Sequence, residues 1–275
     1  MLREAAARRA PLAEGIDAVA PGLLWMRETR TIVAADAHLA YEDVIGGALP
    51  TWSTGEAISV LQKAAEEFGA REFLFLGDII HGARMSDGAA LAVQSGLERL
   101  RAIAQVTLVA GNHEGRTRGA DVLGETVEFA ERSGWLLVHG DNSCHPELSV
   151  CHPELVEGPR AAPGIGRKTR GVIIGHLHPS VRSNGTSAPA FLSGSGVIVV
   201  PALTPYSEGL DVCGDDCFEA LKAFGVTTRG ELQVVAATEE AVYPLGSVSG
   251  LQKELRRPWE PPQHRYRRKF LRPDR

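Results

Sequence analysis

Five short apolar runs, none with regular polar alternation, constrain the fold of this chain more than any other feature. They are Ile32–Ala35, Phe73–Leu76, Val106–Val109, Trp135–Val138 and Val172–Ile174. A strand with one face in water carries a polar residue at every second position. Continuous apolar runs of this length therefore predict strands that are buried on both faces.

Amphipathic patterns between these runs predict helices. We expect helices at 54–68, with Thr54 as N-cap, and at 87–104, capped by Asp87, and a third at 120–132. Alternation of strands and helices predicts an α/β fold in which helices cover a sheet.

The other segments are less regular. We expect a loose lead-in at 1–20, paired strands at 22–27 and 31–35, further strands at 191–200 and 232–243, and a short helix near 215–224. A single domain over residues 1–250, with an insertion loop at about 143–168, would then be followed by a basic tail over 251–275.

Each buried run ends in residue types that bind metals. The endings are Asp36-Ala37-His38, Gly77-Asp78-Ile79-Ile80-His81, Gly111-Asn112-His113-Glu114, His139-Gly140-Asp141 and Gly175-His176-Leu177-His178. Sites in open α/β sheets form at the carboxyl edge of the strands. Five such endings in chain order predict one metal site at that edge.

The residue types suit hydrolysis of a phosphate ester. This reaction needs a strong nucleophile at neutral pH and neutralisation of the phosphoryl charge, and two divalent ions roughly 3.5–4 Å apart supply both. A shared carboxylate would hold the ions at that spacing, with imidazoles and an amide oxygen completing the ligands. We expect the glycines at 77, 111, 140 and 175 to let the backbone bend sharply near the ions.

The order Asp-x-His, Gly-Asp-x-x-His, Gly-Asn-His-Glu, His-Gly, Gly-His-x-His resembles the calcineurin-like metallophosphoesterases. The resemblance implies a layered α/β/β/α sandwich, with a metal-bridging hydroxide as nucleophile. One metal would take Asp36, His38, Asp78 and His178, and the other Asp78, Asn112, His139 and His176. His113 would face the phosphoryl group, stabilise its charge and protonate the leaving oxygen.

Shorter strings are similar to a narrower group, the ligase-associated DNA-damage-response phosphoesterases of bacteria (the PdeM-like group). They include Gly-His-x-His-Pro, Pro201-Ala202-Leu203-Thr204-Pro205 and Gly209-Leu210-Asp211-Val212. This similarity implies a DNA endonuclease or phosphodiesterase with a role in DNA repair, and a repair ligase or helicase as partner. It also favours Mn²⁺, although the ligand types suit Fe²⁺ or Zn²⁺ as well.

Some residues near the motifs have open roles. His81, Glu114 and Arg116 are candidates for contact with substrate or for supporting the ligands, against plain loop residues. The pentapeptide Cys-His-Pro-Glu-Leu occurs twice, starting at Cys144 and Cys151, within the 143–168 insertion. We interpret the repeat as an inert surface loop, with a zinc knuckle as the alternative.

Composition excludes few classes of function. The formal net charge of −5 does not by itself point to a nucleic-acid partner, although the basic tail with its interleaved aromatics could bind one. No apolar run is long enough to span a bilayer, the start lacks a secretory pattern, and four cysteines suggest no disulfide framework. We therefore expect a cytoplasmic enzyme. The alternatives are a phosphomonoesterase or a hydrolase of small or cyclic nucleotides, and a non-catalytic scaffold.

Overall fold

The computed structural model describes residues 7–46, 51–82, 85–112, 122–141, 169–183, 185–207 and 209–256. Six strands in this part of the chain form the first sheet, in the order β1-β2-β3-β4-β5-β6. They are β1 (Arg9–Ala13), β2 (Ile16–Val19), β3 (Leu23–Met26), β4 (Thr31–Ala35), β5 (Glu72–Leu76) and β6 (Gln105–Val109). Strands β1 to β4 are antiparallel neighbours, whereas β4, β5 and β6 are parallel.

The second sheet has the order β13-β10-β11-β12-β9-β8-β7, with β14 pairing with β11 and β15. Its strands are β7 (Phe129–Arg132), β8 (Trp135–Val138), β9 (Gly171–Ile174), β10 (Pro179–Ser183), β11 (Thr186–Gly194), β12 (Val197–Val199), β13 (Leu210–Asp211), β14 (Gln233–Ala237) and β15 (Val242–Ser247). The central strands β8, β9 and β12 are parallel.

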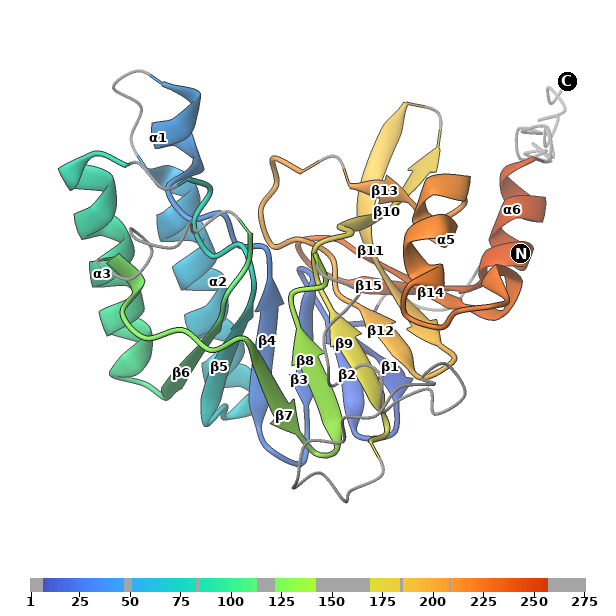
Figure 1. The fold of residues 1–275 in the computed structure, drawn as a ribbon, viewed down its shortest axis with the longest axis horizontal. Coiled ribbons are helices and arrows are strands. Elements are labelled where there is room, and N and C mark those ends of the chain that lie inside the picture. Colours follow the sequence, from blue (N-terminus) through green and yellow to red (C-terminus); the bar gives the residue numbers. More distant parts are fainter. Residues whose placement is uncertain are drawn as a thin grey trace, which may run out of the picture.

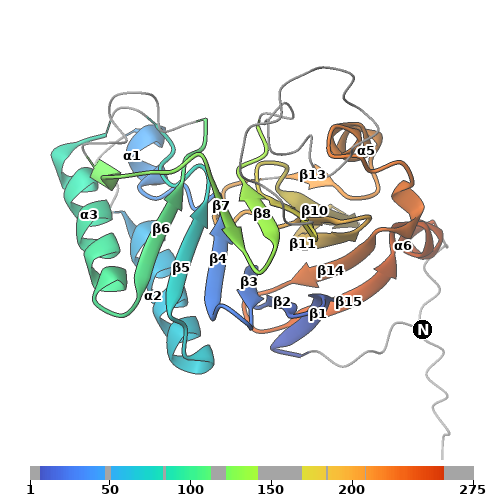
Figure 2. The same ribbon diagram turned by 60° about the horizontal axis from the view of Figure 1, so that its bottom comes forward.

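Helices cover the outer faces of both sheets (Figure 1). The described part of the chain contains the helices α1 (Tyr41–Ile45), α2 (Trp52–Phe68), α3 (Asp87–Arg101), α5 (Asp215–Lys222) and α6 (Val248–Leu255), with a short 3₁₀ turn η3 (Arg229–Glu231). Buried side chains of α2 and α3 pack on the first sheet, and those of α5 and α6 pack on the second. A third apolar cluster fills the space between the sheets, so the expected α/β/β/α sandwich is confirmed (Figure 2).

The continuous apolar runs are explained by this layering. In β4, Ile32 and Ala34 face the helices, whereas Val33 and Ala35 face the second sheet. The same division holds in β9, where Ile173 points between the sheets and its two neighbours point toward α5 and α6. Both faces of these strands are buried, as the sequence predicted.

A charged network joins the two sheets at the start of the parallel strands. The buried carboxylate of Glu72 on β5 accepts hydrogen bonds from Thr31 Oγ1 (2.8 Å), Thr107 Oγ1 (2.7 Å) and Arg132 Nε (2.8 Å). A second guanidinium nitrogen of Arg132 binds the other carboxylate oxygen, so the pair is bidentate. Because Arg132 belongs to the second sheet, this network ties the sheets together.

Several local predictions were wrong. Helix α2 begins at Trp52, and Thr54 lies inside it, where its Oγ1 accepts a hydrogen bond from the backbone N–H of Ala40 (2.8 Å). The cap of α3 is Ser86, not Asp87, because the Ser86 side chain accepts from Ala89 N. Of the expected helix at 120–132, only residues 122–123 are helical in the described part, and Phe129–Arg132 form β7, which pairs with β8.

The ends of the chain also differ from expectation. The expected loose lead-in at 1–20 contains β1 and β2. Strand β1 lies at the edge of its sheet, where Pro11 is tolerated because an edge strand has unpaired backbone groups. Residues 251–255, counted with the basic tail, belong to α6. The 143–168 insertion, with both copies of the pentapeptide, and the tail from residue 257 lie outside the described residues.

Candidate metal centre

The predicted site residues follow neighbouring parallel strands in both sheets. Asp36, Asp78 and Asn112 follow β4, β5 and β6, while His139 and His176 follow β8 and β9. Backbone hydrogen bonds connect the turns: His38 N donates to Asp78 O (2.9 Å) and Gly175 N donates to His139 O (3.0 Å). The carboxyl ends of the two sheets therefore form one edge that carries these side chains.

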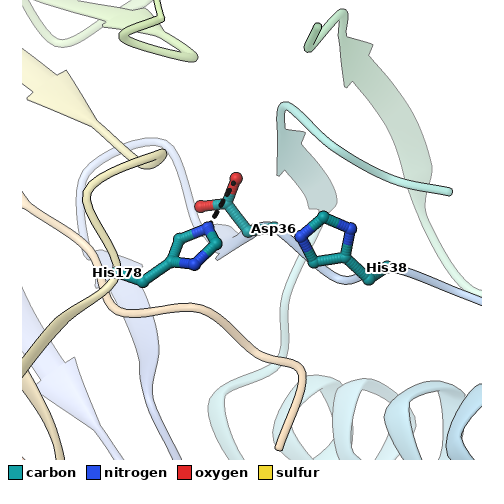
Figure 3. A group of neighbouring side chains, drawn as sticks. All are labelled: Asp36, His38 and His178. Carbon is teal, nitrogen blue, oxygen red and sulfur yellow. Dashed lines mark ion pairs between the residues drawn. The ribbon is translucent and has the colours of Figure 1, made fainter. Parts of the chain in front are cut away.

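The first group consists of Asp36, His38 and His178, whose potential ligand atoms all lie within 4.8 Å of one another. Figure 3 shows the two imidazole rings on either side of the Asp36 carboxylate. His178 Nε2 lies 3.4 Å from Asp36 Oδ1. The other ring nitrogen of His178, Nδ1, is in hydrogen-bond contact with the hydroxyl of Ser207. A ligating histidine is commonly held in this way by a polar partner at its second nitrogen.

The second group consists of Asp78, His139 and His176, again within 4.8 Å. His139 Nε2 lies 3.5 Å from Asp78 Oδ2 and 3.2 Å from His176 Nδ1. Asn112 joins this group, since its Oδ1 lies 2.9 Å from the same Nε2 atom. An amide oxygen, a carboxylate and two imidazoles thus surround one point.

His139 connects the two groups. Its Nδ1 lies 3.4 Å from Asp36 Oδ1, while its Nε2 faces Asp78. Asp36 also accepts a hydrogen bond from His176 N at Oδ2 (2.8 Å). The groups are therefore contiguous, and each contains residues from both sheets.

The site is buried and its charges are coupled. Asp36 is completely buried, and Asp78 and His139 are each 2% exposed. Burial alone would lower the pKa of His139, but the hydrogen bond to Asp78 and the charges of Asp36, Asp78 and Asp141 raise that pKa above the ordinary value. Burial, together with the neighbouring His139, lowers the pKa of His176. The carboxylates therefore favour positive charge on His139, whereas the environment of His176 favours its neutral form.

The donor set fits divalent metal ions. Among the described residues, Asp36 Oδ1 and His178 Nε2 are buried atoms without a hydrogen-bond partner, although they face each other. A buried carboxylate oxygen without a partner costs free energy, and a cation between these two atoms would satisfy both. The mixture of carboxylate, imidazole and amide without thiolate suits Mn²⁺, Fe²⁺ or Zn²⁺.

Five of the candidate ligands have an unusual backbone conformation. Asp36, His38, His176 and His178 have φ of 48°, 42°, 56° and 43°, and Asp78 has φ of 37°. Positive φ is uncommon for residues with a side chain and costs roughly 1–3 kcal/mol each. Strain of this kind gathers at functional sites, and here it falls on the turns that bring the side chains together.

The glycines of the motifs act in two ways. Gly77 and Gly140 have φ of 73° and 104°, which agrees with the expected sharp bends. Gly111 and Gly175 instead leave space: a Cβ at Gly111 would lie 2.2 Å from Asp78 N and Oδ1, and one at Gly175 would lie 2.6 Å from Asp36 Oδ2. Close packing against the carboxylates, not left-handed backbone, requires glycine at these two positions.

The structure brings together all seven residues expected to bind metal. Of the three further candidates, His81 lies beside the first group, with its Nδ1 3.0 Å from His38 Nδ1. The catalytic candidate His113, together with Glu114 and Arg116, lies outside the described residues. Sequence reasoning missed Ser207, although it directly follows the Pro-Ala-Leu-Thr-Pro string and Tyr206.

Comparison with known proteins identifies the class. Residues 29–180, more than half of the chain, match the family model of the calcineurin-like phosphoesterases. The chain therefore belongs to the calcineurin-like phosphoesterase family, and it is a hydrolase of phosphoester bonds from a family that depends on divalent metals.

One solved structure supports the fold, and a second is reported as a weaker similarity. The nuclease MPE of Pseudomonas putida matches with a TM-score of 0.56 and 20% identity, covering 84% of this chain and 94% of that protein. Yfce, a phosphoesterase from E. coli, matches with a TM-score of 0.36 and 14% identity, covering 79% and 98%. No curated protein sequence matches the chain. None of the described helices is both long and apolar enough to cross a membrane.

Proposed function

We propose that this protein is a binuclear metal-dependent phosphodiesterase that cleaves DNA. The observation that carries the proposal is the pair of contiguous Asp/His groups, each drawn from both sheets and joined by His139. Asp36, His38, Asp78 and His178 would hold one ion, and Asp78, Asn112, His139 and His176 the other, with Mn²⁺ favoured. Bound ions of this kind activate water and neutralise charge on the phosphoryl oxygens.

The residues of the chain have separate tasks in this proposal. Buried Asp36 and Asp78 supply negative charge at a point that water cannot easily screen. Ser207 orients the His178 ring through Nδ1, which leaves Nε2 directed at Asp36. His113 would stabilise charge on the phosphoryl group and protonate the leaving oxygen.

The choice of DNA rests on three supports. They are the motif similarity to the PdeM-like group, the basic tail, and the structural likeness to a protein described as a nuclease. A role in DNA repair with a ligase or helicase partner rests only on the similarity to the PdeM-like group, whereas a cytoplasmic location rests on the sequence composition.

One set of assays tests the proposal. The purified protein, loaded with Mn²⁺, should cleave single-stranded DNA and a small phosphodiester, and Asp78→Asn should reduce both activities by several orders of magnitude. Cleavage of a monoester or cyclic nucleotide alone would favour a small-substrate hydrolase. A protein that binds no divalent metal and cleaves none of these substrates would instead be a scaffold. Full activity of Asp78→Asn or His113→Ala would refute the mechanism.

A further inference from the structure

A row of aromatic rings leads outward from the first group of ligands. The His38 and His81 rings lie 4.7 Å apart at 69°, and the His81 and Tyr41 rings lie 4.5 Å apart at 68°. The row ends at Tyr206, which stacks on Tyr41 with centroids 4.7 Å apart and planes at 15°. Tyr206 is 45% exposed, so the outer end of the row is open to solvent.

The backbone fixes this row relative to the candidate metal centre. Tyr41 begins α1, five residues after Asp36. The loop that carries Tyr206 runs along the end of β4, because Leu203 N donates to Ala35 O (2.8 Å) and Thr204 N donates to Asp36 O (3.4 Å). The next residue, Ser207, contacts His178. Both tyrosines are therefore attached to the strand end that positions the first group.

A negative charge beside the Tyr206 hydroxyl disfavours a phosphate there. Glu42 is buried and accepts hydrogen bonds from Ser53 N and Ser53 Oγ, both at 2.7 Å. Burial would raise the pKa of Glu42, but these hydrogen bonds lower it below the usual value, so the group stays ionised. The hydroxyl of Tyr206 lies 3.4 Å from this carboxylate. An uncharged planar group suits this place better than an anion.

We propose that Tyr41 and Tyr206 form a stacking platform for a base of single-stranded nucleic acid whose phosphate lies at the candidate metal centre. The inference rests on the proposed nuclease function and adds a specificity-determining contact to it. Tyr41 stacks on one face of the Tyr206 ring, and the exposed part of Tyr206 would receive the base. Every base has a π-face, so such a platform would favour unpaired strands with little preference for sequence.

The test uses short single-stranded oligonucleotides in which bases are removed one position at a time. For each, kcat/KM is compared with that of the complete oligonucleotide, and the cut position is read from product lengths. In the wild type, loss of one base near the cut should reduce kcat/KM by roughly 5- to 100-fold, the range expected for one base stacked on an aromatic ring. The ratio within each variant cancels any general loss caused by a disturbed metal centre.

Three variants complete the experiment. In Tyr206→Ala, the ratio of kcat/KM for the complete oligonucleotide to kcat/KM for the one lacking a base should fall to about 1. Tyr206→Phe keeps the ring and should retain the wild-type ratio. Trp52→Ala removes an aromatic residue that is 66% exposed on α2 and serves as the matched control, with an unchanged ratio. An unchanged ratio in Tyr206→Ala, or no base dependence in the wild type, overturns the platform. If the wild type cleaves a small phosphodiester but no oligonucleotide, the nuclease proposal fails, and the platform fails with it.

Discussion

Replacing Arg132 by methionine should destabilise the fold through the carboxylate that it leaves behind. The side chain of Glu72 is 8% exposed and that of Arg132 is 25% exposed. Removing one partner of a fully buried ion pair costs roughly 3–5 kcal/mol. Thr31 and Thr107 would still donate to Glu72, and partial exposure screens the charge, so we expect a loss of about 2–3 kcal/mol at pH 7.

The pH dependence of this loss identifies its cause. Burial acts to raise the pKa of Glu72, but the hydrogen bonds from Arg132, Thr107 and Thr31 and the charge of Arg132 lower it below the usual value. A lowered carboxyl pKa in the folded state adds stability above the unfolded pKa, and this stability is lost as the pH falls through the folded pKa. Without Arg132, burial should raise the pKa of Glu72 relative to its value in the wild type. The difference between wild type and variant should therefore be largest near neutrality and shrink toward about pH 4.

Urea unfolding followed by tryptophan fluorescence measures the effect. Arg132→Met is compared with Arg132→Met/Glu72→Gln, which removes the charge and should regain stability at pH 7. Arg170→Met is the control, because its 2.8 Å pair with Glu14 is exposed and should contribute less than about 1 kcal/mol. A loss for Arg132→Met no greater than that of the control, or one independent of pH, would refute this reasoning.

Three further predictions concern the candidate metal centre. Gly111→Ala should lower kcat/KM on the order of 100-fold, because the new Cβ would displace Asp78, while the matched Gly55→Ala in α2, which meets no atom within 4 Å, should leave activity unchanged. Ser207→Ala should weaken Mn²⁺ binding by about 10- to 100-fold in calorimetry, and binding equal to wild type would show that Ser207 does not orient His178. Adding Mn²⁺ at about 100 times its Kd should raise the melting temperature by roughly 5–10 °C, and no shift in scanning calorimetry would contradict the donor fit.

The sequence predicted the buried strands and the proximity of the candidate ligands for one shared physical reason. Ile32 to Ala35 are apolar because helices cover one face of this strand and the second sheet covers the other. Polar side chains can therefore occur only after the strand ends. Polar residues placed directly after parallel neighbours, such as Asp36 and Asp78, must then meet at one edge. The order of the motifs, through the family resemblance, then predicted which residues from distant strands share a metal ion.

Other features depended on tertiary contacts that periodicity does not show. Phe129 to Arg132 form a strand because they pair with β8, which overrides their local pattern. Thr54 resembles a helix cap in sequence, but its hydroxyl is used by Ala40 from another segment. The contact between Tyr41 and Tyr206 joins residues far apart in the chain, and no local signal announces it.

The division of each ligand group between the two sheets has a consequence for the behaviour of the whole molecule. An ion held by Asp36 and His178, or by Asp78 and His139, would connect the two sheets in addition to the apolar contacts and the Glu72–Arg132 ion pair. Metal binding would thus strengthen the contact between the sheets, and a chelator would reverse this effect. The stability of the contact between the two sheets would then depend on the concentration of metal around the enzyme.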